Sequence, residues 1–95
     1  MYTELSDPDG QAEVLNYLGD LALEHPDAGD PLEIFGRALT IARDIGTAAH
    51  EAHALTGQAQ CLIRAGRNDE AVTLMRQAHD IKETLMIAEE VNHLQ

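Results

Sequence analysis

The chain has 95 residues, enough for one small domain with a thin core. Its 17 Asp and Glu against six Lys and Arg give a net charge of -11, which argues against direct binding to nucleic acid or to anionic membranes. The single cysteine, Cys61, excludes an internal disulfide and fits a reducing compartment. Apolar residues make up 44% of the chain but aromatic residues only 3%, a composition typical of closely packed helices.

The charges are unevenly distributed along the chain. The first 35 residues contain nine acidic residues and no Lys or Arg, and all six basic residues follow. An acidic half either attracts a basic partner or keeps the domain soluble. No secretory signal and no apolar stretch of the ~18 residues that a bilayer requires is evident, so we expect a cytoplasmic protein without membrane contact.

The sequence repeats itself with an offset of 40 residues, between segments that begin at Ala12 and Ala52. Two different sequences with one pattern of side-chain sizes indicate a structural unit used twice. The aligned pairs keep small or apolar character without a gap: Leu15 with Leu55, Gly19 with Ala59, Phe35 with Met75, Ala38 with Ala78, Ile41 with Ile81, and Ile45 with Leu85. We therefore expect a single domain of residues 1–95, with a polar leader (1–9), one repeat (10–46) and a second repeat (47–95).

The first repeat predicts two helices. Residues 10–25 form the first, because apolar residues recur at spacings of three and four: Val14, Leu15, Leu18, Leu21 and Ala22. A loop with two prolines follows, and Asp30 is placed to cap a second helix that ends near Ile45, before Gly46. The residues of this helix predicted to face inward are Ile34, Phe35, Ala38, Leu39, Ile41 and Ala42.

The second repeat predicts a third helix over residues 48–65, capped by Thr47 and ended by Gly66. A fourth helix follows the cap at Asn68 or Asp69. No Gly or Pro interrupts it, so we expect it to run from about residue 69 to 93, roughly 37 Å. That length exceeds its partner helix, so another surface must cover four apolar residues at its end: Met86, Ile87, Val91 and Leu94.

The segment LIRAGRNDEAVTLMRQA resembles a tetratricopeptide repeat. The resemblance is carried by Ala59, Gly66, Asp69-Glu70-Ala71, Met75 and Ala78, and in the first repeat by Leu18-Gly19-Asp20, Phe35 and Ala38. The first repeat departs at Pro31, where the family usually has Ala. The 40-residue offset is similar to the extended variant of kinesin light chains and of bacterial multidomain transcription regulators. The resemblance implies an all-α, right-handed solenoid of two helix-turn-helix repeats with four antiparallel helices.

In this family the first helix of each repeat lines a concave groove. The resemblance therefore implies a site for a protein or peptide, formed by Glu13, Asn16, Asp20, Leu23, His53, Thr56, Gln60, Ile63 and Arg64. Amide and hydroxyl side chains of this kind hydrogen-bond to an extended peptide backbone. The acidic residues of the first repeat favour a basic or neutral ligand.

Three functional hypotheses follow. The first is a non-catalytic interaction module in a regulatory or signalling system. The second is a self-associating structural protein, a homodimer through Met86, Ile87, Val91 and Leu94, and an excerpt of a longer repeat regulator is a further alternative. The third is a metal site at His50 and His53, but no third ligand is apparent, so we expect neither metal nor other cofactor. We interpret Cys61 as a packed thiol and expect no catalytic residue.

Overall fold

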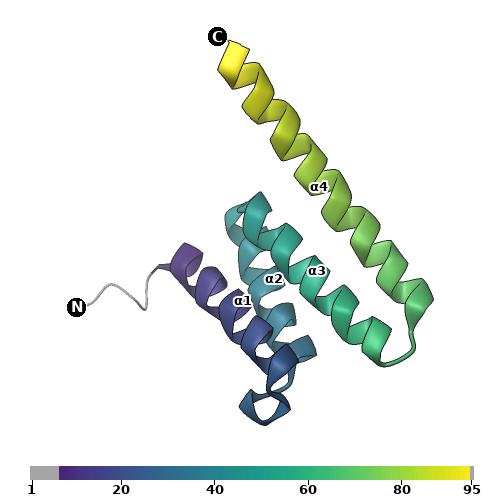
Figure 1. Cartoon of the computed structure of the whole chain (residues 1–95). Coiled ribbons are helices and arrows are strands. Elements are labelled where there is room, and N and C mark those ends of the chain that lie inside the picture. The colour runs from purple at the N-terminus through teal and green to yellow at the C-terminus, as the bar shows by residue number, and fades with distance from the viewer. Residues whose placement is uncertain (1–6, 95) are drawn as a thin grey trace.

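The computed structural model describes residues 7–94, and these residues form an all-α fold (Figure 1). Its elements are α1 (Pro8–Glu24), the short 3-10 helix η2 (Pro26–Ala28), α2 (Pro31–Ile45), α3 (Ala48–Arg64) and α4 (Asn68–Leu94). Consecutive α-helices pack against each other, and α1 also contacts α3. The helices α1 and α3 have 17 residues each and begin 40 residues apart.

Local capping explains where α1 and α2 begin. The Asp7 carboxylate accepts a hydrogen bond from the Gly10 N–H at 3.1 Å, so α1 begins two residues before its predicted start. The Asp30 carboxylate accepts from the Leu32 N–H at 3.1 Å, which confirms the predicted cap of α2.

The turn between α2 and α3 follows the prediction in one respect and departs from it in another. Gly46 ends α2 with φ 72°, a left-handed conformation that favours glycine. Thr47 precedes α3 as predicted, but its hydroxyl makes no capping hydrogen bond. It donates instead to the Asp9 carboxylate at 3.4 Å, and so links the start of α3 to α1.

The core is built around the ring of Phe35, which is fully buried between α1 and α3. A Cβ atom at Gly19 of α1 would lie 2.6 Å from the nearest ring carbon, and one at Gly57 of α3 would lie 2.4 Å away. Glycine at both positions therefore makes room for the ring. The other buried apolar residues are mostly small, namely Ala12, Ala22, Leu23, Ala38, Ala42, Ala52, Ala54, Leu55, Ala59, Leu62, Ala71 and Ala78.

The helix α1 turns its larger apolar side chains away from this core. Val14, Leu18 and Leu21 are 55%, 42% and 38% exposed, whereas Ala12 and Gly19 are buried. The apolar stripe that predicts α1 is therefore mostly a solvent-facing surface. The small residues on the opposite side of the helix let α1 approach α2 and α3 closely.

The helix α4 continues beyond the other three, so the prediction of one unbroken C-terminal helix is confirmed. Its first half packs against α3, and its end projects away from the rest of the molecule (Figure 1). Met86, Ile87 and Val91 on this projecting end are exposed. The side chain of Leu94 lies outside the described residues.

Candidate functional site

The predicted groove residues lie on α1 and α3, which meet along a line of polar contacts. The Asp20 carboxylate of α1 lies 3.0 Å from Nε2 of His53, and the Asp9 carboxylate lies 3.3 Å from Nε2 of His50. Both histidines extend from α3 toward an acidic residue of α1. We call these four residues, together with Asn16, the polar seam.

Asn16 occupies the middle of the polar seam and is only 1% exposed. Its Nδ2 donates to the backbone carbonyl of His50 at 3.1 Å, and its Oδ1 has no partner among the described residues. A side chain so enclosed does not present itself to a peptide. The predicted ligand contact is replaced by a structural one, because the close approach of α1 and α3 buries this position.

Three other predicted groove residues are also used within the fold. The Thr56 hydroxyl donates to the Ala52 carbonyl of its own helix at 2.9 Å. Arg64 donates to the backbone carbonyl of Leu23, whose side chain is buried, at the far end of the contact between α1 and α3. A cavity of about 270 Å³ opens beside this pair, and it is lined by Leu23, Asp30, Pro31, Leu32, Cys61 and Arg64.

The remaining predicted residues form a surface that we call the acidic face, composed of Glu13, Asp20, His53, Gln60 and Ile63. Glu13, Gln60 and Ile63 are exposed, and the side chains of Asp20 and His53 are about half exposed. Residues seven positions apart lie on one side of a helix, so Glu13 lies on the side of Asp20, and Gln60 on the side of His53. The contact between Asp20 and His53 joins the two helices in the middle of this face.

The α1 half of the acidic face is strongly negative. No Lys or Arg occurs before Arg37, so α1 contributes Glu13 and Asp20 without a base of its own, and His53 of α3 lies 3.0 Å from the Asp20 carboxylate. The acidic face therefore carries a negative potential toward solvent, and that potential favours cationic ligands.

Cys61 lies on the inner side of α3 near the cavity beside Leu23. Burial raises the pKa of its thiol, the negative charge of Asp30 adds to the increase, and the positive charge of Arg64 opposes it. A thiol with a raised pKa stays protonated and is a poor nucleophile. This environment suits the packed thiol that the sequence predicts.

Metal-binding geometry is not formed by the part of the chain that the structure describes. No group of three or more His, Cys, Asp or Glu residues there is arranged to hold an ion. His50 and His53 each face a carboxylate of α1 instead. Within residues 7–94, no helix is both long enough and apolar enough to cross a membrane.

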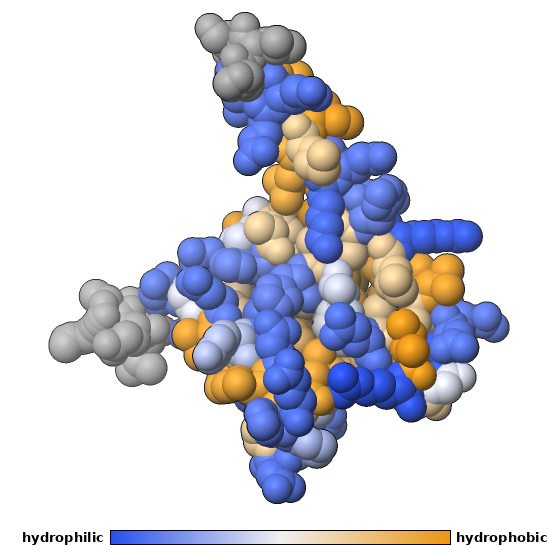
Figure 2. Space-filling view, in the orientation of Figure 1, coloured by the Kyte–Doolittle hydropathy of each residue, from blue (hydrophilic) through white to orange (hydrophobic). Residues whose placement is uncertain are grey.

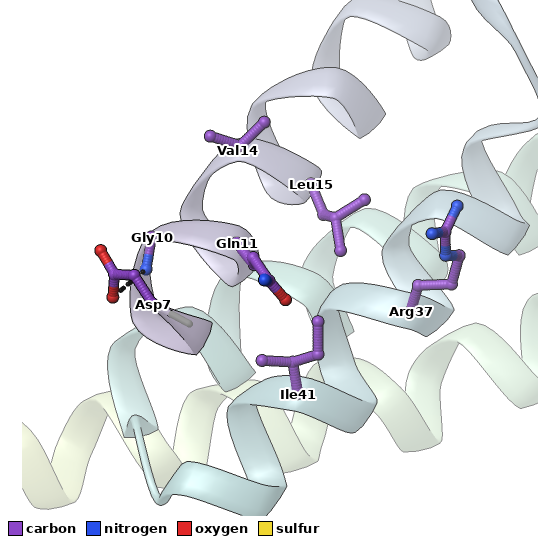
Figure 3. A pocket seen from close by; sticks show the side chains of 7 residues that line it. All are labelled: Asp7, Gly10, Gln11, Val14, Leu15, Arg37 and Ile41. Carbon is purple, nitrogen blue, oxygen red and sulfur yellow. Dashed lines mark hydrogen bonds between the residues drawn. The ribbon is translucent and has the colours of Figure 1, made fainter. Parts of the chain in front are cut away.

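The structure also reveals an apolar surface that sequence reasoning missed, at the edge formed by α1 and α2. A cavity of about 420 Å³ lies there, lined by Asp7, Gly10, Gln11, Val14, Leu15, Arg37 and Ile41. Leu15 of α1 and Ile41 of α2 extend toward one another in it (Figure 3). The sequence does contain a signal for this surface. The apolar residues of α1 cover a wider part of the helix circumference than contact with the core requires.

Comparisons with protein-family models, with curated proteins and with solved structures found no match. The resemblance to tetratricopeptide repeats therefore remains a prediction from the residues themselves, and the function has to be argued from the surfaces described above.

Proposed function

We propose that this chain is a non-catalytic protein-interaction module whose acidic face binds an extended peptide that carries Lys or Arg. The observation that carries the proposal is the pair of carboxylates of the exposed Glu13 and the half-exposed Asp20, on a helix without any basic residue. A regulatory or signalling context is consistent with such a module.

The α3 half of the acidic face supplies the other chemistry that peptide recognition needs. The exposed amide of Gln60 both donates and accepts hydrogen bonds, as a peptide backbone requires. Ile63, one turn further along α3, is 48% exposed and offers an apolar contact. The acidic side chains of α1 favour a cationic side chain of the ligand. The amide and the apolar residue of α3 favour contacts with the peptide backbone and with an apolar side chain.

The test is binding of the chain to an array of short Lys- and Arg-containing peptides and to their Glu-containing counterparts. Glu13→Gln with Asp20→Asn should weaken binding of the basic peptides at low salt by roughly tenfold or more, because two of the closest charges are removed. Glu89→Gln with Glu90→Gln is the matched control, since it removes the same charge from the exposed end of α4. Equal losses in both variants, or no preference for basic peptides, would contradict the proposal.

Self-association through the projecting end of α4 is a second candidate function. It is favoured by the exposure of Met86 and Ile87, which are 68% and 59% exposed, and of Val91. An interface between two such helices would be apolar, as in obligate homodimers. Met86→Glu with Val91→Glu should then lower the solution mass by removing the association that this end contributes, at unchanged helix content, whereas an unchanged mass would exclude this interface.

A further inference from the structure

Two apolar flanks of the molecule face solvent. We define the α1 flank as Val14, Tyr17, Leu18 and Leu21, all of which are exposed. We define the α4 flank as Val72, Met75, Arg76 and His79, which are also exposed and line a cavity of about 340 Å³ together with Asp80. Figure 2 shows apolar surface over α1 and, separately, over α4.

The two repeats are joined inside the chain where α2 packs against α3. The Phe35 ring of α2 occupies the space that a Cβ atom at Gly57 would need. A Cβ atom at Gly36 would lie 3.4 Å from Nε2 of Gln58, and Leu32 lines the same cavity as Cys61. One face of α2, over residues 32–36, therefore meets one face of α3, over residues 57–61.

The 40-residue offset relates this internal joint to the two flanks. The joint residues of α3, when moved back by 40 positions, fall on the α1 flank: Gly57 on Tyr17, Gln58 on Leu18, and Cys61 on Leu21. The joint residues of α2, when moved forward by 40 positions, fall on the α4 flank: Leu32 on Val72, Phe35 on Met75, and Gly36 on Arg76.

Both halves of the internal joint thus recur at opposite ends of the chain, and within residues 7–94 their side chains are exposed. The surface equivalent to the α2 side of the joint is present on α4, and the surface equivalent to its α3 side is present on α1. We propose that a second copy of this chain docks head to tail, with the α1 flank of one copy against the α4 flank of the next. The apolar residues of this contact lie outside the acidic face, whereas the acidic residues of α1 take part in both proposals.

Arg76 gives the α4 flank a positive charge that can meet the acidic residues of α1. The α1 helix contains acidic residues and no base. The α4 flank contains Arg76 and His79, beside the carboxylates of Asp80 and of Glu83, which lies 3.7 Å from Nε2 of His79. Opposite charges at the rim of an apolar contact steer association and fix its orientation. The same charges disfavour contact between two α1 flanks, which would bring like charges together.

The contact between copies differs from the internal joint in side-chain size. Tyr17 stands in place of Gly57, and Met75 stands in place of Phe35, so the two helices must lie further apart than α2 and α3 do. The unbranched Met75 adapts to irregular space, and the guanidinium of Arg76 is suited to stacking on an aromatic ring such as Tyr17. We expect a weaker, concentration-dependent contact.

Complementation between two variants tests the proposal. Leu18→Glu disables the α1 flank and Met75→Glu disables the α4 flank, and both residues are exposed, so folding should be retained. Met86→Glu and Val91→Glu are present in both proteins, so that the projecting end of α4 contributes nothing. Solution mass is measured by light scattering for each protein alone and for the equimolar mixture, with helix content and thermal unfolding as controls for folding.

Each variant alone should have the mass of the 10.4 kDa monomer. The mixture should form a dimer of twice that mass, because each variant retains the flank that the other lacks. The protein with both flanks intact should grow beyond a dimer as its concentration rises, since a head-to-tail contact does not close on itself. We expect either flank substitution to weaken self-association by roughly tenfold or more. A mixture that stays monomeric, or a Leu18→Glu variant that self-associates as strongly as the protein with both flanks intact, would overturn the proposal.

Discussion

The two glycines beside Phe35 make the packing of the core directly testable through Gly57→Ala. The new methyl group would lie 2.4 to 2.5 Å from three carbons of the ring. The ring cannot retreat, because Gly19 on the other side already approaches so closely that a Cβ there would lie 2.6 Å from it. The substitution therefore forces α1 and α3 apart or drives the ring from its rotamer.

The magnitude is the difference between two opposing effects. Overpacking of a filled core costs about 1–3 kcal/mol, and the pinned ring places this site near the upper end. Replacing glycine by alanine inside a helix stabilises it by about 0.8–1.0 kcal/mol. The net expectation is a loss of about 2 kcal/mol in the free energy of unfolding, which lowers Tm by roughly 8–16 °C in a domain of this size.

Urea unfolding followed by circular dichroism measures this change. Gly36→Ala is the matched control, because its Cβ would meet only the flexible end of Gln58 at 3.4 Å, and it should be neutral or stabilising. Phe35→Leu should cost less in the Gly57→Ala background than in the original chain, with a coupling of about 1 kcal/mol or more. If Gly57→Ala is as stable as Gly36→Ala, the ring does not occupy this space.

Further predictions concern the buried polar and titratable groups. Asn16→Asp should lower the free energy of unfolding by about 2–3 kcal/mol in urea, because it removes the hydrogen-bond donor to the His50 carbonyl and buries a carboxylate against that carbonyl. A smaller loss of stability than for Glu13→Gln would contradict the burial of Asn16. The raised pKa of Cys61 should make its alkylation slower in the folded chain than in urea at mildly alkaline pH, and equal rates would show an open thiol. The Cys61 thiol has a higher pKa in the folded chain than in the unfolded chain, so folding favours the protonated thiol. The resulting contribution to the free energy of unfolding is complete below the unfolded pKa and is lost as pH rises through the folded pKa. Thermal unfolding across alkaline pH would detect this loss. Gly46→Ala should cost about 1 kcal/mol by the same urea assay, because only its left-handed φ opposes a side chain, and a neutral result would mean that the turn relaxes.

The helices were predictable because their signals are local. Asp30, Pro31 and Gly46 act on neighbouring backbone groups, so their roles follow from the sequence. The length of α4 followed from the lack of any Gly or Pro after Gly66. These features need no knowledge of what lies across the core.

The orientation of α1 was not predictable in the same way. Its apolar residues cover more than one side, so spacing alone does not tell whether Leu18 or Gly19 faces the core. The structure decides in favour of Gly19, because only a residue without a Cβ accommodates Phe35 there. That choice turns Leu18 outward and buries Asn16, which the family pattern places in a groove.

Phe35 also has a consequence for the motion of the whole domain. The Phe35 ring contacts α1 and α3 at once. A flip of the ring about its Cβ–Cγ bond therefore requires both helices to move away from it together. Flips of this ring should therefore be slow and should report cooperative breathing of the two repeats. Phe35 is the single phenylalanine of the chain, so its ring resonances give an unambiguous measure of how tightly the two repeats are coupled.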